Sequence, residues 1–522
     1  MFVVAFGLCG CNGELIRFLD EDRPLWLSAQ LDTTTFRYST ARRTLTFTLR
    51  LEADRRGNYS IVHGATCATG KTPNNATHAG SFENRVAAGD SVTILLDDVA
   101  TYGRGVSVCA SDTADYQRAE QYVSFQPALD YLAEQNEATG SGLPLDLGAA
   151  GEYAVFQDNW LSGFPNRGNA GPAANSVNLP QQFAAFVDPN DSYAIKYFVV
   201  DMQNHRVLVF RQIPSAWGSS ADVVIGQTGF SGDQPNANNP VGALGFNIPT
   251  SVAVSVTGTL YVSDLGNHRV AAFYAIPRSN GVAADFVIGQ PDFLSNAANN
   301  GTLPSQAQRL NQPVSVSVFH QRLYVVDRQN HRVLVFNPLP TAIGPAAVLA
   351  IGQPDTGTLV MGTDYTLSGS YLRFPAHLAF GNSRLYISDN FNHRVLVFNS
   401  IPTVPDSRPN LVIGQATVTG MSADCGGSTN AQCLSDPRGI AVKDNVLAVA
   451  DYGNNRVLFF DVSVPIVFPS AHSVLGQADF SSNNSATSSN GLRGPTALNF
   501  DERYIWISDY SNHRIVFRQL PY

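Results

Sequence analysis

The chain has 522 residues, of which 33 are basic and 42 acidic, giving a formal net charge of -9. Hydrophobic residues make up 44% and charged residues 14% of the chain, so it can bury a large core, and disorder is excluded as its main state. The acidic balance and the lack of a Lys/Arg-rich run argue against a nucleic-acid partner. No stretch approaches the ~18 to 20 consecutive apolar residues that cross a bilayer as a helix.

The chain begins with a short apolar run, MFVVAFGLCGCNG. Its end, Leu8 to Cys11, resembles the cleavage box of bacterial lipoprotein signal peptides, although the basic segment that usually precedes the apolar run is missing. This resemblance implies that residues 1–19 are a truncated lipoprotein signal and tether, with Cys11 as the lipidated residue. We therefore expect a bacterial protein of the cell surface or periplasm, lipid-anchored or secreted, that meets the membrane only through that anchor. The alternative is a buried first strand with incidental cysteines.

The other four cysteines form two pairs by position, Cys67 with Cys109 and Cys425 with Cys433. Neither pair has the spacing of a zinc site. We expect two disulfides, which suit an oxidising compartment.

Residues 20–125 contain short strand patterns separated by turn signals, such as 44–49, 59–62 and 91–96. Their number and spacing predict an immunoglobulin-like β-sandwich of ~100 residues. Residues 126–150 have first a helical composition and then a Gly/Ser-rich one, which indicates a short helix and a linker.

The remainder of the chain is a repeat. The string DxxNHR or a close copy occurs six times, with successive Asp residues 63, 63, 62, 62 and 58 positions apart. An apolar strand precedes and follows each copy, so each copy predicts the turn of a hairpin. The residues of the six turns are Asp201, Asn204, His205 and Arg206; Asp264, Asn267, His268 and Arg269; Asp327, Asn330, His331 and Arg332; Asp389, Asn392, His393 and Arg394; Asp451, Asn454, Asn455 and Arg456; and Asp509, Asn512, His513 and Arg514.

Two further markers complete the repeat. VIGQ recurs after each hairpin except the last, and a proline followed by alternating apolar residues precedes each hairpin. Each unit thus contains four strands, which is the content of a propeller blade. Residues 151–522 are therefore predicted to form an all-β, six-bladed propeller.

These motifs resemble the NHL repeat. Pro437 to Val442 (PRGIAV) matches the start of its signature, and 385–389 (LYISD) with 392–394 (NHR) matches the rest. The resemblance implies an NHL-like propeller in which the turn residues are structural.

The number of strands predicts how the ring closes. The chain ends after the third strand of the sixth unit, and a VIGQ-like strand at Ala154–Gln157 precedes the first unit. We expect one blade to take three strands from the C-terminal end and its fourth strand from this segment, which covers an otherwise open edge.

Within each turn, we expect the Asp to accept backbone N–H bonds, the Asn to adopt a left-handed conformation, and the His and Arg to pack or pair across blades. The five repeat histidines are not expected to share a metal, because equivalent positions on neighbouring blades are at least ~10 Å apart.

The residues two and four positions after each proline are expected to line the central channel. Among them Gln182, His377 and Asn499, together with the neighbouring Arg438, are the polar candidates. They supply neither three histidines nor an oxygen cage, so no catalytic, cofactor or metal residue is assigned.

The preferred function is a monomeric, exported or cell-surface binding scaffold rather than an enzyme. The long connections after VIGQ are expected to form one loop-rich face that binds a protein or a saccharide. The alternative is a metal-dependent enzyme, similar to the propeller lyases and lactonases, with Ca or Zn at the channel mouth.

Overall fold

The structure is a computed structural model. It describes the backbone of strands between residues 27 and 146, and it describes residues 153–520 apart from 160, 192–193, 215–217, 302–305, 358–370, 406 and 501–503. The predicted signal with Cys11, the residue Cys67 and the predicted helix before the linker lie outside the described residues. Among the described residues, no helix is long and apolar enough to cross a membrane.

The N-terminal part contains two four-stranded sheets, ordered β5-β2-β1-β8 and β4-β3-β6-β7. Their strands are β1 (Leu27–Ser39), β2 (Thr44–Ala53), β3 (Gly57–His63), β4 (Ala76–Phe82), β5 (Ser91–Leu96), β6 (Gly105–Asp112), β7 (Arg118–Ser124) and β8 (Leu145–Asp146). The three strand patterns read from the sequence fall within β2, β3 and β5. The packing of the two sheets into a sandwich stays a prediction. Within the predicted linker, β8 pairs in parallel with the end of β1.

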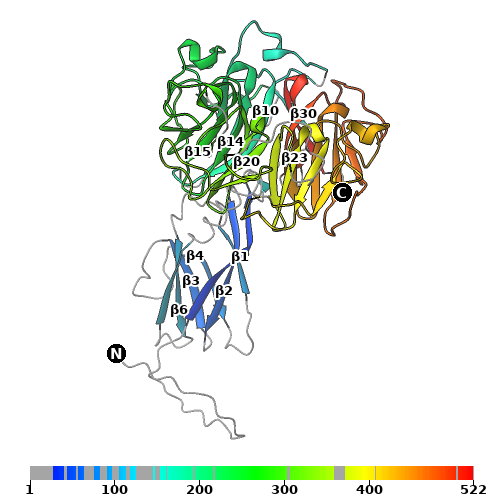
Figure 1. The fold of residues 1–522 in the computed structure, drawn as a ribbon. Helices are drawn as coiled ribbons and strands as arrows, with labels where there is room; N and C mark the ends of the chain where they lie inside the picture. Colours follow the sequence, from blue (N-terminus) through cyan, green and yellow to red (C-terminus); the bar gives the residue numbers. More distant parts are fainter. Residues whose placement is uncertain are drawn as a thin grey trace. The chain divides into compact units, whose positions relative to one another are not determined.

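The C-terminal part is a six-bladed propeller, in which each blade is a four-stranded antiparallel sheet (Figure 1). The first strands are β10 (Pro180–Asp188), β14 (Pro249–Val254), β18 (Pro313–Phe319), β22 (His377–Gly381), β26 (Pro437–Lys443) and β30 (Pro495–Phe500). The second strands are β11 (Ala194–Asp201), β15 (Leu260–Asp264), β19 (Arg322–Asp327), β23 (Arg384–Asp389), β27 (Val446–Asp451) and β31 (Tyr504–Asp509).

The third strands are β12 (Arg206–Phe210), β16 (Arg269–Phe273), β20 (Arg332–Phe336), β24 (Arg394–Phe398), β28 (Arg456–Asp461) and β32 (Arg514–Gln519). The fourth strands are β13 (Val223–Ile225), β17 (Phe286–Ile288), β21 (Leu349–Ile351), β25 (Leu411–Ile413), β29 (Ser473–Leu475) and β9 (Tyr153–Val155). Short 3-10 turns join the second and third strands: η2 (Met202–Asn204), η4 (Leu265–Asn267), η6 (Arg328–Asn330), η8 (Asn390–Asn392), η10 (Tyr452–Asn454) and η11 (Tyr510–Asn512).

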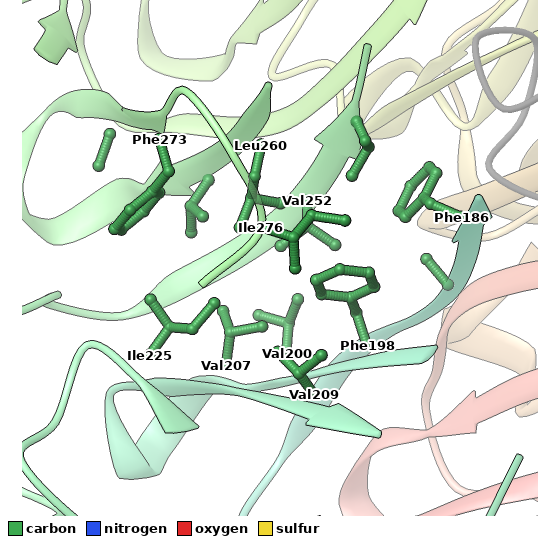
Figure 2. Close-up of a cluster of buried hydrophobic side chains, with 14 of the residues drawn as sticks. Phe186, Phe198, Val200, Val207, Val209, Ile225, Val252, Leu260, Phe273 and Ile276 are labelled. Carbon is green, nitrogen blue, oxygen red and sulfur yellow. The ribbon is translucent and has the colours of Figure 1, made fainter. Parts of the chain in front are cut away.

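The core lies between neighbouring blades, because each sheet is covered on both faces. Strand β12 (RVLVF) is therefore buried at every position instead of alternating. Between the first two blades, Phe198 and Val209 from one sheet pack with Leu260 and Phe273 of the next, as Figure 2 shows. Burial of such apolar surface is the main stabilisation of the ring.

The ring closes as the strand count predicts. Strand β9 pairs antiparallel with β32, with Ala154 opposite Val516, and it forms the outer strand of the sixth blade. Between the sixth and first blades, the Phe183 ring contacts Trp506 and Phe517 at centroid distances of 4.8 and 5.4 Å. The expected closure by three strands and one strand is thus confirmed.

A sharp turn with positive φ follows each fourth strand, and the VIGQ glycine occupies it in five blades, whereas Phe156 with φ of 71° occupies it after β9. Gly226 has φ of 88°, and a Cβ atom there would lie 2.2 Å from the Phe246 ring.

Candidate functional site

The Asp of each turn is the centre of a buried hydrogen-bond network. Its Oδ2 accepts bonds from the Asn side chain and from the Arg Nε, at 2.7 Å each for Asp201. Its Oδ1 accepts the backbone N–H of a residue before the first strand, at 2.7 Å from Asn178. The other five turns repeat this pattern. The network fixes the turn against the start of its own blade.

Burial raises the pKa of the Asp451 carboxyl to about 6, while the Arg456 charge and the hydrogen bonds oppose this shift. The carboxyl is therefore still ionised at neutral pH, and the pair stays charged inside the protein.

The His of each turn joins its blade to the next one. Nδ1 of His205 accepts the backbone N–H of Ile248 at 3.0 Å, and the other four histidines form the equivalent bond. In the fifth blade Asn455 replaces the histidine, and its Oδ1 accepts the N–H of Gly494 at 2.9 Å. The side chain at this position therefore acts as an acceptor, which explains why Asn serves as well as His.

Burial lowers the pKa of the imidazoles of His205, His268, His331 and His393. It lowers the pKa of His513 to about 4, and the Arg493 charge acts in the same direction. These histidines are neutral at pH 7, as an Nδ1 acceptor must be.

The expected left-handed Asn is a wrong prediction. The residue with positive φ is the His, at 54° for His205, or Asn455 in the fifth blade, at 53°. The reason is that the 3-10 turn ends at this residue, which caps it, whereas the Asn side chain is used to bond the Asp carboxylate.

The Arg of each turn holds the long connections. Nη2 of Arg206 donates to the carbonyls of Ala173 and Ser176, both at 2.9 Å, in the preceding connection. Its Nη1 donates to the carbonyl of Phe230 in the following one. Both connections thus lie at the same end of the blades as the turns. We call this end, formed by the six turns and the described residues of the connections 158–179, 228–247, 291–312, 354–374, 416–436 and 478–494, the loop face.

The Gln of VIGQ also holds the loop face in place. Gln227 Nε2 donates to the Gln234 carbonyl at 2.8 Å, and Gln157 donates to the Phe164 carbonyl at 2.9 Å. In the parts of the connections that the structure describes, four 3-10 segments are ordered with the help of these bonds: η1 (Pro165–Gly168), η3 (Pro235–Asn238), η5 (Ala298–Gly301) and η9 (Ala423–Gly426). The last of them contains Cys425, which is joined by a disulfide to Cys433.

Two positions of the turn vary between blades, namely the two residues directly after the Asp. At the first of them the residues around the ring are Met202, Leu265, Arg328, Asn390, Tyr452 and Tyr510, and we call these six the mouth ring. Asn390 is buried and the other five are partly exposed. Burial raises the pKa of Tyr510, with further influence from Tyr452 and from the opposing charge of Arg438.

A cavity lies at the mouth of the central channel, on the loop face. Every blade contributes to it with the one or two residues after its proline, and two mouth-ring residues complete it. Its lining is Gln181, Gln182, Thr250, Ser251, Val314, Arg328, Ala376, His377, Asn390, Arg438, Thr496 and Ala497. The space open to the centres of water molecules is ≈ 40 Å³, several times the ~10–15 Å³ that one water needs.

The structure brings three of the four channel candidates to this cavity. Gln182, His377 and Arg438 line it, whereas Asn499 does not and is 3% exposed. Strand residues advance ~3.3 Å each, so Asn499, four positions after its proline, lies deeper along the channel than the mouth. Sequence reasoning missed Arg328 and Asn390, whose signal was their place at a variable position of the turn.

Two of the candidates serve the contacts between inner strands. Gln182 Oε1 accepts the N–H of Val252 in the next blade at 2.7 Å. His377 forms the equivalent contact between its own blade and the next one, through a hydrogen bond with the backbone of Ile440. Burial lowers the pKa of the His377 imidazole to about 4. No described residue forms a hydrogen bond with its Nδ1.

A chain of polar contacts crosses the cavity wall. Arg328 Nη2 donates to Asn390 Oδ1 at 3.2 Å, and Asn390 Nδ2 donates to Asp436 Oδ1 and to the Pro437 carbonyl. Arg438 Nη2 pairs with Asp436 Oδ2 at 3.3 Å, and its guanidinium lies 3.4 Å from the centroid of the Tyr452 ring.

Within the described part of the chain, no group of three or more His, Cys, Asp or Glu side chains is placed to hold a metal ion.

Comparison with protein families matches the model "NHL repeat" at residues 246–273 and 434–460, which lie in the second and fifth blades. Comparison with curated proteins finds no match.

Solved structures that resemble the chain include selenomethionine-substituted virginiamycin B lyase from Staphylococcus aureus, with 13% identity, TM-score 0.35 and coverage of 67% of this chain and 97% of that one. A nidogen/laminin complex has 12% identity, TM-score 0.31 and coverage of 57% and 82%. The computationally designed Ika8 protein has 9% identity, TM-score 0.31 and coverage of 69% and 99%.

The chain thus contains two repeats that match the NHL repeat, and it forms a six-bladed β-propeller whose other four blades are built on the same Asp, Asn and Arg network.

Proposed function

We propose that the propeller is a binding module that receives a protein partner on its loop face, with the mouth ring at the centre of the contact. The observation that carries this proposal is the variation of the mouth ring beside Asp and Arg positions that are the same in all six turns. The Asp and Arg positions have structural roles and keep one residue, whereas the mouth ring differs from blade to blade. Arg, Tyr and Met, which occur in the ring, are enriched in protein interfaces.

The rigidity of the loop face supports the same function. Backbone carbonyls of the connections are fixed by buried Arg and Gln side chains, as for Arg206 and Gln227. A surface that is already ordered loses less conformational entropy when a partner binds, so more of the contact energy appears as affinity.

Large apolar side chains protrude from the connections. Leu161 is 75% exposed, Phe164 is 63% exposed and Leu294 is 75% exposed. Their neighbours are mainly Asn, Ser and Gly, so the surface combines apolar anchors with a polar surround, as protein interfaces do. NHL propellers commonly bind proteins. For these reasons we prefer a protein to a saccharide as the ligand.

An extracytoplasmic location belongs to the proposal. The Cys425–Cys433 disulfide supports it, because such bonds persist in oxidising compartments.

The test is to pan a displayed peptide library against the full chain and to compare two variants. The first, Tyr452→Ser with Tyr510→Ser, alters the mouth ring. The second, Val467→Ser, alters a 65% exposed residue between β28 and β29, at the opposite end of the blades. We expect enriched peptides to bind the second variant as they bind the unaltered chain and to bind the first at least tenfold more weakly.

Peptides that bind all three proteins equally would contradict the proposed face. A glycan array probed with the same proteins tests the saccharide, and glycan binding that depends on the mouth ring, without any peptide binding, would replace the protein partner by a carbohydrate.

A further inference from the structure

Arg328 is the only charged residue of the mouth ring, and its charge is not compensated. Among the described residues it forms no ion pair, and the carboxylate that acts on it, Asp436, is already paired with Arg438. Burial and the like charge of Arg438 lower the pKa of Arg328, but an arginine remains protonated at neutral pH. The two arginines and one aspartate at the cavity thus leave one excess positive charge in an acidic protein.

Two hydrogen-bond donors at the cavity have no partner among the residues that the structure describes. Nε of Arg328 is buried without a hydrogen bond, and so is the hydroxyl of Thr250, a residue that is 4% exposed. Both residues line the cavity. Buried donors without partners are unfavourable, and they become favourable when a ligand supplies an acceptor.

The Arg328 side chain is held in position for such a ligand. Its guanidinium carbon lies 5.6 Å from the centroid of the Phe391 ring and 5.9 Å from that of Phe374, and Nη2 is bonded to Asn390. These contacts fix the plane of the guanidinium while leaving Nε unpartnered. A planar, fixed guanidinium is the geometry that binds a carboxylate through two hydrogen bonds.

The size of the cavity limits the ligand. A space of ≈ 40 Å³ for the centres of water molecules admits a carboxylate group with a few waters. The unpartnered Nδ1 of His377, also in the lining, can be satisfied by one of these waters.

We propose that this cavity binds the carboxylate of an Asp or Glu side chain presented by the protein partner, and that Arg328 and Thr250 are its hydrogen-bond donors. This inference rests on the proposed function, because a carboxylate held at the centre of the loop face would anchor a partner that covers the mouth ring.

The cavity can be tested with acetate as a probe, without knowledge of the partner. Binding of acetate to the full chain at pH 7 is measured by the broadening of its methyl proton signal, at constant ionic strength. The test variant is Arg328→Leu, because Leu265 occupies the same place in the second blade and shows that the turn accepts leucine. The matched control is Arg278→Leu, which removes an arginine that is 57% exposed and does not line the cavity.

We expect acetate to bind the unaltered chain and the control equally and to bind Arg328→Leu at least tenfold more weakly. Thr250→Val, which keeps the side-chain shape and removes the hydroxyl, is expected to weaken binding severalfold. If Arg328→Leu fails to fold, as judged by circular dichroism, Arg328→Lys and Thr250→Val carry the test. Equal binding by the cavity variants, or displacement of acetate by an equal concentration of chloride, would overturn the inference.

Three short peptides identify the source of the carboxylate by competition with acetate. Ac-Gly-Glu-Gly-NH2 is expected to compete at least tenfold better than Ac-Gly-Gln-Gly-NH2. If Ac-Gly-Gly-Gly-OH competes better than Ac-Gly-Glu-Gly-NH2, the cavity binds the carboxylate of a chain terminus, and the proposed Asp or Glu side chain is refuted.

The two proposals can fail separately. Panned peptides that depend on Tyr452 and Tyr510 but bind Arg328→Leu unchanged would leave the proposed function standing and refute the carboxylate site. Acetate binding that depends on Arg328, with no peptide binding at all, would leave the carboxylate site standing and refute the proposed function.

Discussion

Nδ1 of His513 accepts the backbone N–H of Leu179 at 3.0 Å, although the two residues are 334 positions apart in the sequence. The bond joins the last blade to the first, as the other turn residues join consecutive blades. Strand β9 closes the same junction within the sixth blade, where it pairs with β32. Both ends of the propeller sequence are therefore needed to shut the ring.

Strand β9 should contribute as much to the stability of the propeller as the fourth strand of any other blade. Ala154→Pro places a proline in the middle of β9, where the residue is fully buried and lies opposite Val516. We expect the free energy of unfolding to fall by about 1–3 kcal/mol, because proline disrupts the strand pairing and leaves a buried backbone group without its hydrogen-bond partner. The measurement is urea unfolding of the full chain followed by tryptophan fluorescence.

The reference for this variant is Val412→Pro, at the equivalent position of β25 opposite Leu396. The two variants should lose similar stability. An Ala154→Pro chain that unfolds like the unaltered protein, beside a destabilised Val412→Pro chain, would show that β9 does not close the ring.

The His513 bond should make stability depend on pH. The pKa of His513 is about 4 in the folded chain and about 6.5 in an unfolded one. Between these values the unfolded chain binds a proton that the folded chain does not, so stability is full above pH 6.5 and falls as the pH decreases toward 4. The contribution of this single residue reaches about 3 kcal/mol at the lower end of the window.

His513→Asn isolates this contribution. Asn455 shows that an amide oxygen accepts the same bond, and an amide does not titrate. The buried carboxyls are unchanged and cancel in the comparison. Urea unfolding at pH 7, 6, 5 and 4.5 should therefore show a smaller acid loss for the variant, and parallel curves for the two proteins would contradict the role assigned to the neutral imidazole.

The fold was readable from the sequence because its determinants are repeated. Each DxxNHR copy predicts a hairpin turn, and the turn residues are buried together, as Asp201 and Arg206 are at 0% exposure. The degenerate copy at Ala154–Gln157 was recognisable because Gln157 keeps the role of the other glutamines and donates to the His513 carbonyl at 2.8 Å.

The cavity was less accessible to sequence reasoning for the opposite reason. Arg328 and Asn390 stand at a position that does not repeat, and their proximity to His377 arises only when the blades are arranged around a common axis. The hydrogen bond between each turn histidine and the next blade could not be predicted from the sequence either. The sequence suggested that the histidine packs or pairs across blades, but not that its Nδ1 accepts a backbone N–H.

The buried Arg of the turn should be essential for stability. Arg332 is fully buried, pairs with Asp327 at 2.8 Å and donates to the carbonyls of Thr356, Gln306 and Arg309. Arg332→Leu leaves a buried carboxylate without its counter-charge, which costs about 3–5 kcal/mol. Urea unfolding measures the loss.

Arg278→Leu is the control, because this exposed arginine lies 4.0 Å from Asp191 and exposed pairs contribute at most about 1 kcal/mol. Adding Asp327→Asn to Arg332→Leu should recover part of the lost stability by removing the buried charge. An Arg332→Leu chain as stable as the control would refute the structural role of the pair.

The Cys425–Cys433 disulfide should order the connection 416–436. It closes a loop with a sequence separation of 8, for which the chain-entropy estimate is about 2–3 kcal/mol. The Cys433 carbonyl also accepts a bond from Arg456 Nη2 at 3.1 Å, so the disulfide fixes a point to which the turn of the same blade is attached. We expect Cys425→Ala with Cys433→Ala to reduce the free energy of unfolding by that amount and to speed hydrogen exchange most strongly within 416–436.

The unaltered chain treated with reductant should show the same local change, whereas reductant should leave this segment of the double variant unaffected. If both thiols in the unaltered protein are alkylated without reductant, the disulfide is absent under those conditions and the ordering must come from the hydrogen bonds alone.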